Sequence, residues 1–351
     1  MNTFAETLIA WQRGHGRHGL PWQVRDAYRV WLSEIMLQQT QVDTVIPYYG
    51  RFLARFPDLP SLAAAPVEDV LTLWSGLGYY ARARNLHKCA QAVMDRHGGA
   101  FPADPALLAE LPGIGRSPAA AISAFSHGTR AAILDGNVKR VLTRCFGIDG
   151  FPGSKNVENA LWTLAESLLP ASDVDIYTQA QMDLGATVCT RGRPACGRCP
   201  VAGRCVALRD GRVGELPTPR PKKVVRERDG RFAVIVADGA VLLERRPPTG
   251  IWGGLLSLPE LPEDADTAPW VATRFGLRVR KVERLAGFRH VFTHFTLNLQ
   301  PELVDAATPG ACGETTLLWQ PLDRLDEAAL PAPVRKLPVQ LTQRDLLAGA
   351  D

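Results

Sequence analysis

Two carboxylates have surroundings that suit acid-assisted bond cleavage. Glu34 lies in the apolar stretch 31–37, and the positions three and four residues away carry no cation. On a helix such a glutamate is either a solvated outer residue or, when buried, an acid whose raised pKa keeps it protonated near neutrality. Asp135 precedes a predicted helix, where it is an N-cap and is stabilised as an anion. Two carboxyls whose surroundings push their pKa values apart are the arrangement that cleaves glycosidic bonds.

Four of the seven cysteines are crowded into one short segment, with the spacing Cys189-x6-Cys196-x2-Cys199-x5-Cys205. An odd total gathered in this way indicates a metal site in a reducing compartment rather than a secreted disulfide framework. Zinc sites commonly use two CxxC pairs and this segment has one, so the spacing favours a [4Fe–4S] cluster, with zinc as the alternative. No second cluster motif, flavin site or nucleotide fingerprint accompanies it, which favours a structural or DNA-linked role over electron transfer.

Residues 111–115 read Leu-Pro-Gly-Ile-Gly and separate two predicted short helices. The two glycines let the backbone approach a ligand closely, and the start of the next helix offers N–H groups and a positive dipole end. That combination suits one DNA phosphate, held without reading sequence. An ordinary tight turn is the alternative, and Pro118 removes one donor from the first turn of that helix.

Amides and aromatics supply two further features of DNA-binding proteins. Residues 38–41 read Gln-Gln-Thr-Gln, and residues 76–80 read Gly-Leu-Gly-Tyr-Tyr. Amides bond base edges, and an aromatic side chain on a glycine-rich loop can enter a base stack. Tyr79 and Tyr80 as plain core aromatics are the alternative.

The elements that must position these residues divide the chain into three regions. Residues 1–186 show apolar spacings of three and four, which predict helices over 28–39, 42–56, 67–73, 81–97, 104–110, 118–127, 138–146 and 157–169. Residues 187–228 hold the cysteines and then a basic stretch, which is either a solvated linker or a phosphate footprint. Residues 229–351 read as α+β, with a hairpin at Asp238-Gly239, a helix over 266–275 and a strand over 294–300.

Length and composition exclude several classes of protein. The 351 residues are 46% hydrophobic and 22% charged with a net charge of +4, an ordinary globular composition for two or three domains. No apolar run approaches the roughly 18 residues of a membrane helix, and the N-terminus lacks the pattern of a signal peptide. We therefore expect a cytoplasmic protein with no membrane partner and, by default, a monomeric state.

Taken together, these motifs resemble those of the helix-hairpin-helix DNA glycosylases, and closely those of the adenine DNA glycosylase family. The resemblance is carried by residues 31–42, 76–86 and 134–141 and by the cysteine spacing, and it covers nearly the whole chain. It implies a multidomain fold, with an all-α helix-hairpin-helix core, a [4Fe–4S] cluster loop and an α+β Nudix-like C-terminal domain.

The resemblance also implies limits for each part. Residues 1–206 are the helical glycosylase region, in which about 24–132 form a six-helix module with the helix-hairpin-helix at 104–127. About 1–23 and 133–206 form the iron–sulfur module. Residues 207–228 are a basic linker, and 229–351 are the Nudix-like domain.

The implied activity is the excision of adenine mispaired with 8-oxoguanine or guanine in double-stranded DNA, after the adenine is flipped out. By resemblance Glu34 protonates adenine N7, Asp135 stabilises the oxocarbenium-like sugar and Asn137 holds the geometry. Trp22 and Gln179 match the adenine pocket, and the four cysteines match the cluster ligands. The implied DNA contacts are Gln39, Thr40, Tyr79, Leu111, Gly113, Gly115, Ser117, Phe292, Thr293 and His294.

Ser117 separates two kinds of glycosylase. Bifunctional enzymes resembling endonuclease III carry a lysine nucleophile at this position, and a serine cannot form the Schiff base that drives strand cleavage. We expect a monofunctional enzyme that leaves an abasic site, with Lys139 nearby as a source of weak trapping.

The C-terminal domain differs from the Nudix pyrophosphatases in its metal-binding residues. Their metal-binding run of glutamates is missing after residues 250–254, because the predicted helix at 266–275 has Ala, Trp, Val and Thr in those places. We expect no nucleotide hydrolysis. Phe292-Thr293-His294 matches the Phe-Ser-His loop with which the family reads 8-oxoguanine, with threonine in place of serine.

Two other functions stay open on the sequence. One is an endonuclease III-like glycosylase and lyase acting on oxidised pyrimidines, which Ser117 and the second domain oppose. The other is a non-catalytic iron–sulfur protein that binds DNA or senses redox state, and that would bind duplex yet release no base.

Overall fold

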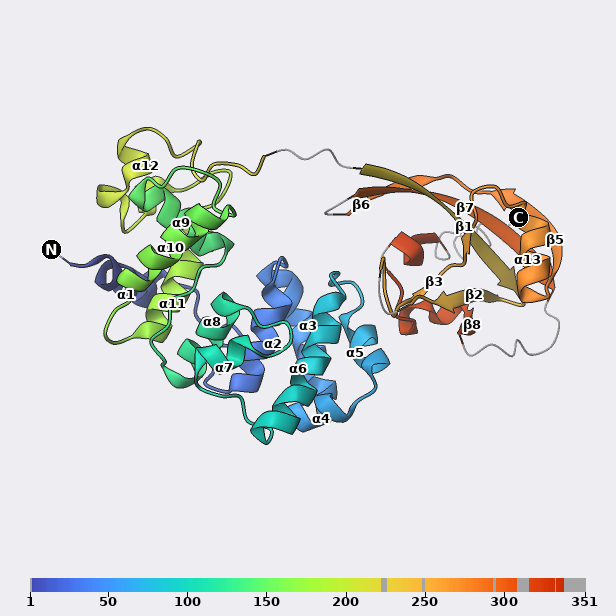
Figure 1. Cartoon of the computed structure of the whole chain (residues 1–351), viewed down its shortest axis with the longest axis horizontal. Helices are drawn as coiled ribbons and strands as arrows, with labels where there is room; N and C mark the ends of the chain where they lie inside the picture. Colours follow the sequence, from blue (N-terminus) through green and yellow to red (C-terminus); the bar gives the residue numbers. More distant parts are fainter. Residues whose placement is uncertain are drawn as a thin grey trace. The chain divides into compact units, whose positions relative to one another are not determined.

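The computed structural model describes residues 2–221, 226–247, 250–292, 295–307, 316–331 and 333–337. The chain divides into two units (Figure 1). The first comprises Met1–Ala64 and Asn85–Lys222, and the second comprises Ala65–Arg84 and Lys223–Asp351. The sequence places residues 65–84 in the helical module, whereas here they group with the C-terminal part of the chain.

The first unit is helical throughout. It contains α1 Phe4–His15, α2 Ala27–Leu37, α3 Val42–Arg55, α4 Leu59–Ala64, most of α6 Ala81–His97, α7 Pro105–Ala109, α8 Arg116–His127, α9 Gly136–Phe146, α10 Lys155–Ser167, α11 Val174–Asp183, the π-helical turn η1 Leu184–Val188, the 3₁₀ turns η2 Cys196–Arg198 and η3 Ala202–Arg204, and α12 Val206–Arg209. No helix within the described residues is long and apolar enough to cross a membrane.

Local sequence explains where these helices begin and end. The Asp104 side chain accepts from the backbone N–H of Ala106, and Pro105 opens α7, as the sequence predicts. Gly128 and Gly147 end α8 and α9 in the left-handed conformation. α8 starts two residues before the predicted position, with Gly115 as its N-cap, so Pro118 falls in the first turn, where a missing N–H costs little.

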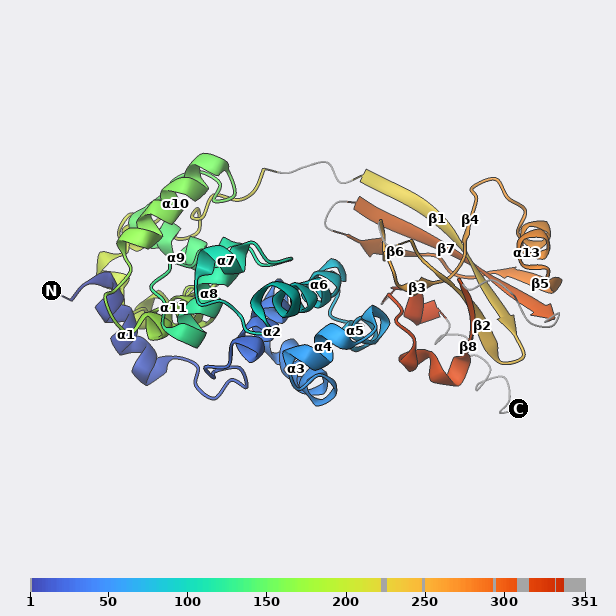
Figure 2. The same cartoon turned by 60° about the horizontal axis from the view of Figure 1, so that its bottom comes forward.

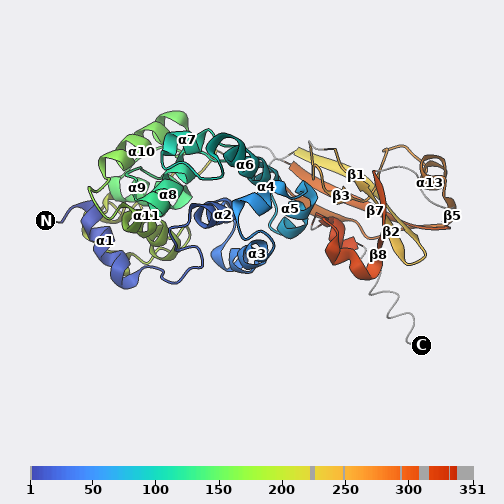
Figure 3. The ribbon, with the colours of Figure 1, turned by 90° about the horizontal axis from the view of Figure 1, so that it is seen from below.

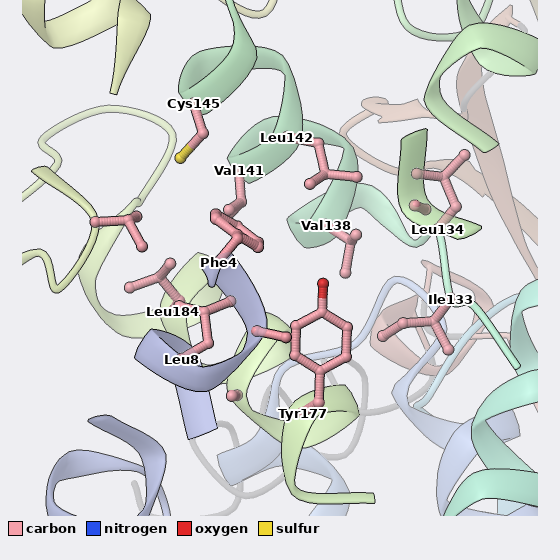
Figure 4. Packing of buried hydrophobic residues seen from close by; sticks show 14 of the residues in the cluster. Phe4, Leu8, Ile133, Leu134, Val138, Val141, Leu142, Cys145, Tyr177 and Leu184 are labelled. Atoms are coloured by element: carbon pink, nitrogen blue, oxygen red, sulfur yellow. The ribbon is translucent and has the colours of Figure 1, made fainter. Parts of the chain in front are cut away.

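The sequence analysis did not place a helix at the N-terminus. α1 is started by a capping box in which Thr3 and Glu6 satisfy each other's backbone N–H groups. Its buried face, with Phe4 and Leu8, belongs to the same core as Val138 of α9 and Tyr177 of α11 (Figure 4). Helix α11 packs against both α8 and α9 in this unit (Figure 3).

The second unit is built on one mixed sheet. Its elements are α5 Val67–Trp74, the first residues of α6, β1 Arg226–Ala237, β2 Ala240–Arg245, β3 Leu256–Ser257, β4 Glu260–Leu261, α13 Thr267–Phe275, β5 Arg278–Arg284, β6 Phe288–Val291, β7 Phe295–Ala307, β8 Leu317–Pro321 and η4 Leu322–Glu327. The strand order is β3-β2-β1-β7-β5, with β4 beside β1, β6 beside β7 and β8 beside β2.

Strands β1 and β7 form the spine of the sheet. They pair in parallel from Arg226 with Phe295 to Val236 with Asp305, while the other pairs are antiparallel. The predicted hairpin is confirmed, because Asp238 and Gly239 both have positive φ, as a two-residue turn between antiparallel strands requires. The helix α13 covers one face next to β5 (Figure 2), and its Phe275 lies in the core of the unit.

Candidate active site

A cavity of about 500 Å³ opens in the first unit. Three of the residues singled out in the sequence line it together, namely Trp22, Glu34 and Gln179. They come from the loop before α2, from α2 and from α11, so only the fold brings them to one place. Asp135 and Asn137 stand at the start of α9, next to this cavity rather than in its lining.

Glu34 faces the cavity on one side of α2, and the opposite side of this helix is packed in the core. Trp31, Ile35 and Met36 are buried, and Ser33 donates its hydroxyl to the Val30 carbonyl. The Glu34 side chain is half-buried at the cavity wall. Desolvation, followed by the negative charge of Asp135, raises the pKa of Glu34 to about 8. Glu34 therefore faces the cavity as a desolvated acid and not as a fully solvated residue.

Asp135 serves as the N-cap of α9, as the sequence predicts. Its Oδ1 accepts from the backbone N–H of Val138 at 2.7 Å, and its Oδ2 accepts from the Asn137 amide at 3.3 Å. Desolvation raises the pKa of Asp135, and these donors together with Arg140 oppose that rise. Burial therefore raises the pKa of both carboxyls, but only at Asp135 do hydrogen-bond donors and a nearby cation oppose the rise. What distinguishes Asp135 is a set of donors around its anion.

Arg140 extends this network toward the cysteines. Its Nη2 donates to the Asn137 Oδ1 at 2.8 Å and to the Gly185 carbonyl at 2.7 Å, and its Nε donates to the Cys189 carbonyl at 2.7 Å. The sequence analysis quoted Arg140 only as part of a motif. Its position one turn after Asn137 on a helix was the signal for a shared role.

We expect Gly185→Ala to disturb this network directly. A Cβ at Gly185 would lie 2.5 Å from the Cβ of Asn137 and 3.0 Å from its Cα, so backbone has to move. The expected result is a loss of stability of roughly 1–3 kcal/mol, as for other overpacked sites, together with slower base release. Urea unfolding and single-turnover rates measure both.

Gly14→Ala is the matched control, because Gly14 lies inside α1 and a Cβ there meets nothing within 4 Å. That variant should be slightly more stable, by about 0.5–1 kcal/mol. Equal effects of the two substitutions would contradict the role assigned to Gly185.

The four cysteines of the segment surround a small apolar cavity. Cys189, Cys196, Cys199 and Cys205 all contribute to the lining of this cavity. The buried Arg144 donates to the Cys189 sulfur at 3.4 Å, which suits a thiolate. These donors fit a [4Fe–4S] cluster, which is bound by four Cys thiolates.

Asp183 and Arg17 were missed by the sequence analysis. Asp183 is fully buried and accepts from the backbone N–H and the Nε of Arg17, at 2.8 and 2.7 Å. It also accepts from the Gln179 Nε2 at 2.8 Å. The four-residue spacing of Gln179 and Asp183 on one helix was the available signal. With its amide nitrogen held, Gln179 retains its Oε1 as an acceptor.

Ser117 and Lys139 have partners that restrict their chemistry. The Ser117 Oγ accepts from the Leu134 backbone N–H at 2.9 Å and so supports the segment that leads into Asp135. Lys139 lies within 2.5 Å of Glu158 in an ion pair. In the hairpin between α7 and α8, Gly113 has φ +79 and a Cβ there would lie 2.8 Å from Asn85, so only glycine fits.

Among the other sequence-predicted DNA contacts, Gln39 and Tyr79 lie on exposed turns. Leu111 is buried, and Thr40 and Phe292 are half-buried. Gln39 follows α2 with φ +59 and is exposed. Tyr79 is 49% exposed in the second unit, on a loop where its own φ is +50. Phe292 stacks on Phe295 with the ring centroids 4.5 Å apart. Thr293 and His294 fall outside the residues that the structure describes.

Comparison with known proteins decides the family. The chain is 36% identical to the adenine DNA glycosylase of Buchnera aphidicola subsp. Schizaphis graminum over 95% of its own length and 97% of that protein. The human adenine DNA glycosylase is 31% identical, over 96% of this chain and 73% of the human protein. The chain belongs to the adenine DNA glycosylase family. It is a base-excision-repair glycosylase, a hydrolase of N-glycosyl bonds.

Family models account for each part of this glycosylase. The HhH-GPD superfamily of base excision DNA repair proteins matches residues 32–167, the iron–sulfur binding domain of endonuclease III matches 189–205, and a NUDIX domain matches 231–338. A thermostable thymine-DNA glycosylase of known structure superposes with a TM-score of 0.54 at 27% identity, covering 59% of this chain and 95% of that one. The predicted fold class and the [4Fe–4S] cluster are confirmed.

Proposed function

We propose that this enzyme removes adenine paired with 8-oxoguanine or guanine in duplex DNA and leaves an abasic site, acting as a monomer. The observation that carries the proposal is the raised pKa of Glu34 on a cavity wall, with a second carboxyl at a helix N-terminus close enough to affect it. A flipped base enters such a cavity, and an acid that is still protonated at neutral pH meets it there.

The chemistry assigns one task to each residue. Protonated Glu34 transfers its proton to adenine N7, which turns the base into a leaving group as the bond between sugar C1′ and N9 breaks. Asp135, held by Val138 and Asn137, places its carboxylate where positive charge develops on the sugar. Water then adds to C1′ and loses one proton to the solvent, and free adenine leaves. Glu34 regains a proton from the solvent, which completes the cycle.

Selection of adenine follows from the amide at the other side of the cavity. Asp183, which is ion-paired with Arg17, accepts a hydrogen bond from the Gln179 nitrogen and so fixes the orientation of that amide. The remaining Oε1 acceptor suits the exocyclic amine of adenine and repels the carbonyl that guanine carries in the same place. Trp22, packed edge-on against Tyr49 with ring centroids 5.4 Å apart, supplies an apolar wall.

DNA recognition is divided between the two units. In the first, the hairpin residues Leu111, Gly113 and Gly115 hold a phosphate, with Gln39 and Thr40 at the widowed base. In the second, Tyr79 enters the stack, and the segment 292–294 reads the base opposite adenine. The roles of Thr293 and His294 rest on the sequence match alone.

Position 117 carries a serine and not a lysine, so strand cleavage tests whether the enzyme is monofunctional. We expect purified enzyme to release adenine from A:8-oxoG duplex without nicking the strand, and borohydride to trap little protein on DNA. The Ser117 hydroxyl cannot form a Schiff base, and Lys139 is ion-paired. Robust crosslinking together with nicking would instead indicate the endonuclease III-like alternative, as would release of thymine glycol. Tight duplex binding with no base release would indicate the non-catalytic one.

The pKa of Glu34 predicts the pH profile. Because the acid must be protonated in the free enzyme, the single-turnover kcat/KM should be flat at neutral pH and fall ~tenfold per pH unit above the pKa of about 8. Rates measured from about pH 6 to pH 10 at constant ionic strength check this. A rate that keeps rising beyond the pKa would contradict proton donation by Glu34.

A further inference from the structure

The segment that carries Tyr79 is bound to the C-terminal part of the second unit at its base. The Ser75 hydroxyl donates to the Leu330 carbonyl at 3.2 Å, and the Tyr80 hydroxyl lies 3.4 Å from the same carbonyl. Arg335 in turn donates to the Ser75 Oγ at 3.0 Å and to the Ala328 carbonyl at 2.9 Å. The loop between residues 75 and 80 is therefore held at both ends by one short stretch of chain.

A second and stronger connection lies five residues after Tyr79. The Arg84 Nη1 donates to the Gly253 carbonyl at 2.6 Å. The carbonyl follows Trp252, whose backbone has φ +56, a left-handed conformation that bulky residues rarely adopt without support from their surroundings. Arg84 binds the carbonyl of the residue that follows Trp252 and so anchors the chain directly after this left-handed position.

Trp252 continues the connection to the C-terminal recognition segment. Its ring is nearly buried and packs against Phe292 at 5.8 Å and Phe232 at 6.2 Å between ring centroids. Phe292 immediately precedes the threonine and histidine assigned to the base opposite adenine. A continuous series of contacts thus runs from the Tyr79 loop through Arg84, Gly253 and Trp252 to Phe292.

We propose that Arg84 and Trp252 are positioning residues that couple stacking by Tyr79 to reading of the opposite base by the segment at Phe292. The proposal rests on the proposed function, because it takes both ends of the series to act on DNA. Without this series of contacts, Tyr79 and the segment at Phe292 would act separately, and recognition of 8-oxoguanine would not assist insertion of the aromatic ring. With this series of contacts, Tyr79 and the segment at Phe292 are presented to the DNA together.

The competing role for Arg84 is a direct phosphate contact. A phosphate contact stabilises every duplex alike and steepens the dependence of affinity on salt. A positioning role acts on the preference between substrates and depends on Tyr79. The two roles therefore give different readouts from the same variant.

The test uses the parent enzyme and five variants, namely Arg84→Met, Tyr79→Leu, their double mutant, Trp252→Phe and Lys88→Met. Lys88 is the matched control, because it is an exposed cation one turn further along α6. Single-turnover rates on A:8-oxoG and A:G duplexes give the preference for 8-oxoguanine, and titrations at several salt concentrations give the salt slope. Melting temperatures verify that each variant is folded.

Arg84→Met is expected to lower the preference for 8-oxoguanine by on the order of tenfold, a typical coupling between sites, without a change in salt slope. Lys88→Met should leave the preference unchanged. In the Tyr79→Leu background the Arg84 substitution should have little further effect, which is the signature of coupling in a double-mutant cycle. Trp252→Phe, a second variant that shortens the ring against Phe292, should act in the same direction.

Three outcomes would overturn the coupling. Equal loss on both duplexes with a shallower salt slope would make Arg84 a phosphate contact. Full multiplicative effects of Arg84→Met and Tyr79→Leu would make the two residues independent. No effect of Tyr79→Leu alone would remove the aromatic from the proposed function itself, a failure distinct from the first two.

Discussion

Glu34→Gln is expected to slow adenine release by a factor of roughly 10²–10⁴, the usual contribution of general acid catalysis. Glutamine keeps the shape of the side chain and its place on α2, but it has no proton to transfer to the purine. Affinity for the mispaired duplex should stay within about twofold, because the DNA contacts lie elsewhere. Single-turnover excision and a fluorescence binding titration measure the two quantities separately.

The same substitution lowers the rate but is expected to increase the stability of the fold at high pH. A carboxyl whose pKa is raised on folding, here to about 8 from 4.5, binds its proton more tightly in the native state, so the native state loses stability as pH rises through that interval. Glutamine does not ionise, and Glu34→Gln should therefore be more stable than the parent protein above pH 8. Near the unfolded-state pKa the difference should disappear.

Glu215→Gln provides the control for this pair of measurements. Glu215 is exposed and forms an i,i+3 ion pair with Arg212, so its neutralisation should change neither the rate nor the stability appreciably. A Glu34→Gln enzyme that turns over at the parent rate would remove the acid from the mechanism. An unchanged pH dependence of stability would show that Glu34 is not desolvated.

Asp135→Asn is the second substitution with a large expected effect, and it separates two roles of one side chain. Asparagine is as good an N-cap as aspartate, so the bond to the Val138 N–H and the stability of α9 should be retained. The negative charge beside the sugar is lost. We expect excision to slow by about 10²–10³, as when one electrostatic stabiliser of a transition state is removed.

The control for Asp135 is another capping aspartate. Asp26 caps α2 by accepting from the Arg29 N–H at 3.0 Å, and Asp26→Asn should preserve both fold and rate. Thermal melts and single-turnover rates on the A:8-oxoG duplex compare the two variants. If Asp135→Asn keeps the parent rate, Asp135 is a helix cap and nothing more.

Local chemistry along the chain was sufficient for much of the helical fold. The cap at Asp104, the glycine end at Gly128 and the apolar spacing of α6 all act within one or two turns, and they explain helices that the sequence predicts at 104–110, 118–127 and 81–97. The hairpin at Asp238-Gly239 is equally local. The parallel pairing of β1 with β7 was not foreseen, because about 60 residues separate strands whose pairing depends on the sheet as a whole.

The candidate site shows the same division at the level of single residues. Residue type and spacing were enough to select Glu34, Asp135 and the cysteines, since a proton donor, an anion at a helix start and four clustered thiolates are chemical properties of the chain itself. They were not enough to find Asp183 or Arg17, whose roles arise only where α11 meets the loop after α1.

The protonation state of Glu34 and the grouping of residues 65–84 were decided by tertiary structure. Both depend on which groups lose their water and which distant residues come into contact. A carboxyl acquires a high pKa only when other elements exclude water from it, so the protonation state of Glu34 belongs to the packed unit and not to residues 31–37. The grouping of residues 65–84 with the C-terminal sheet likewise depends on bonds such as Arg84 to Gly253, across 169 positions of sequence. The sequence determines which functional groups the chain carries, and folding determines which of them are desolvated, charged and close to one another.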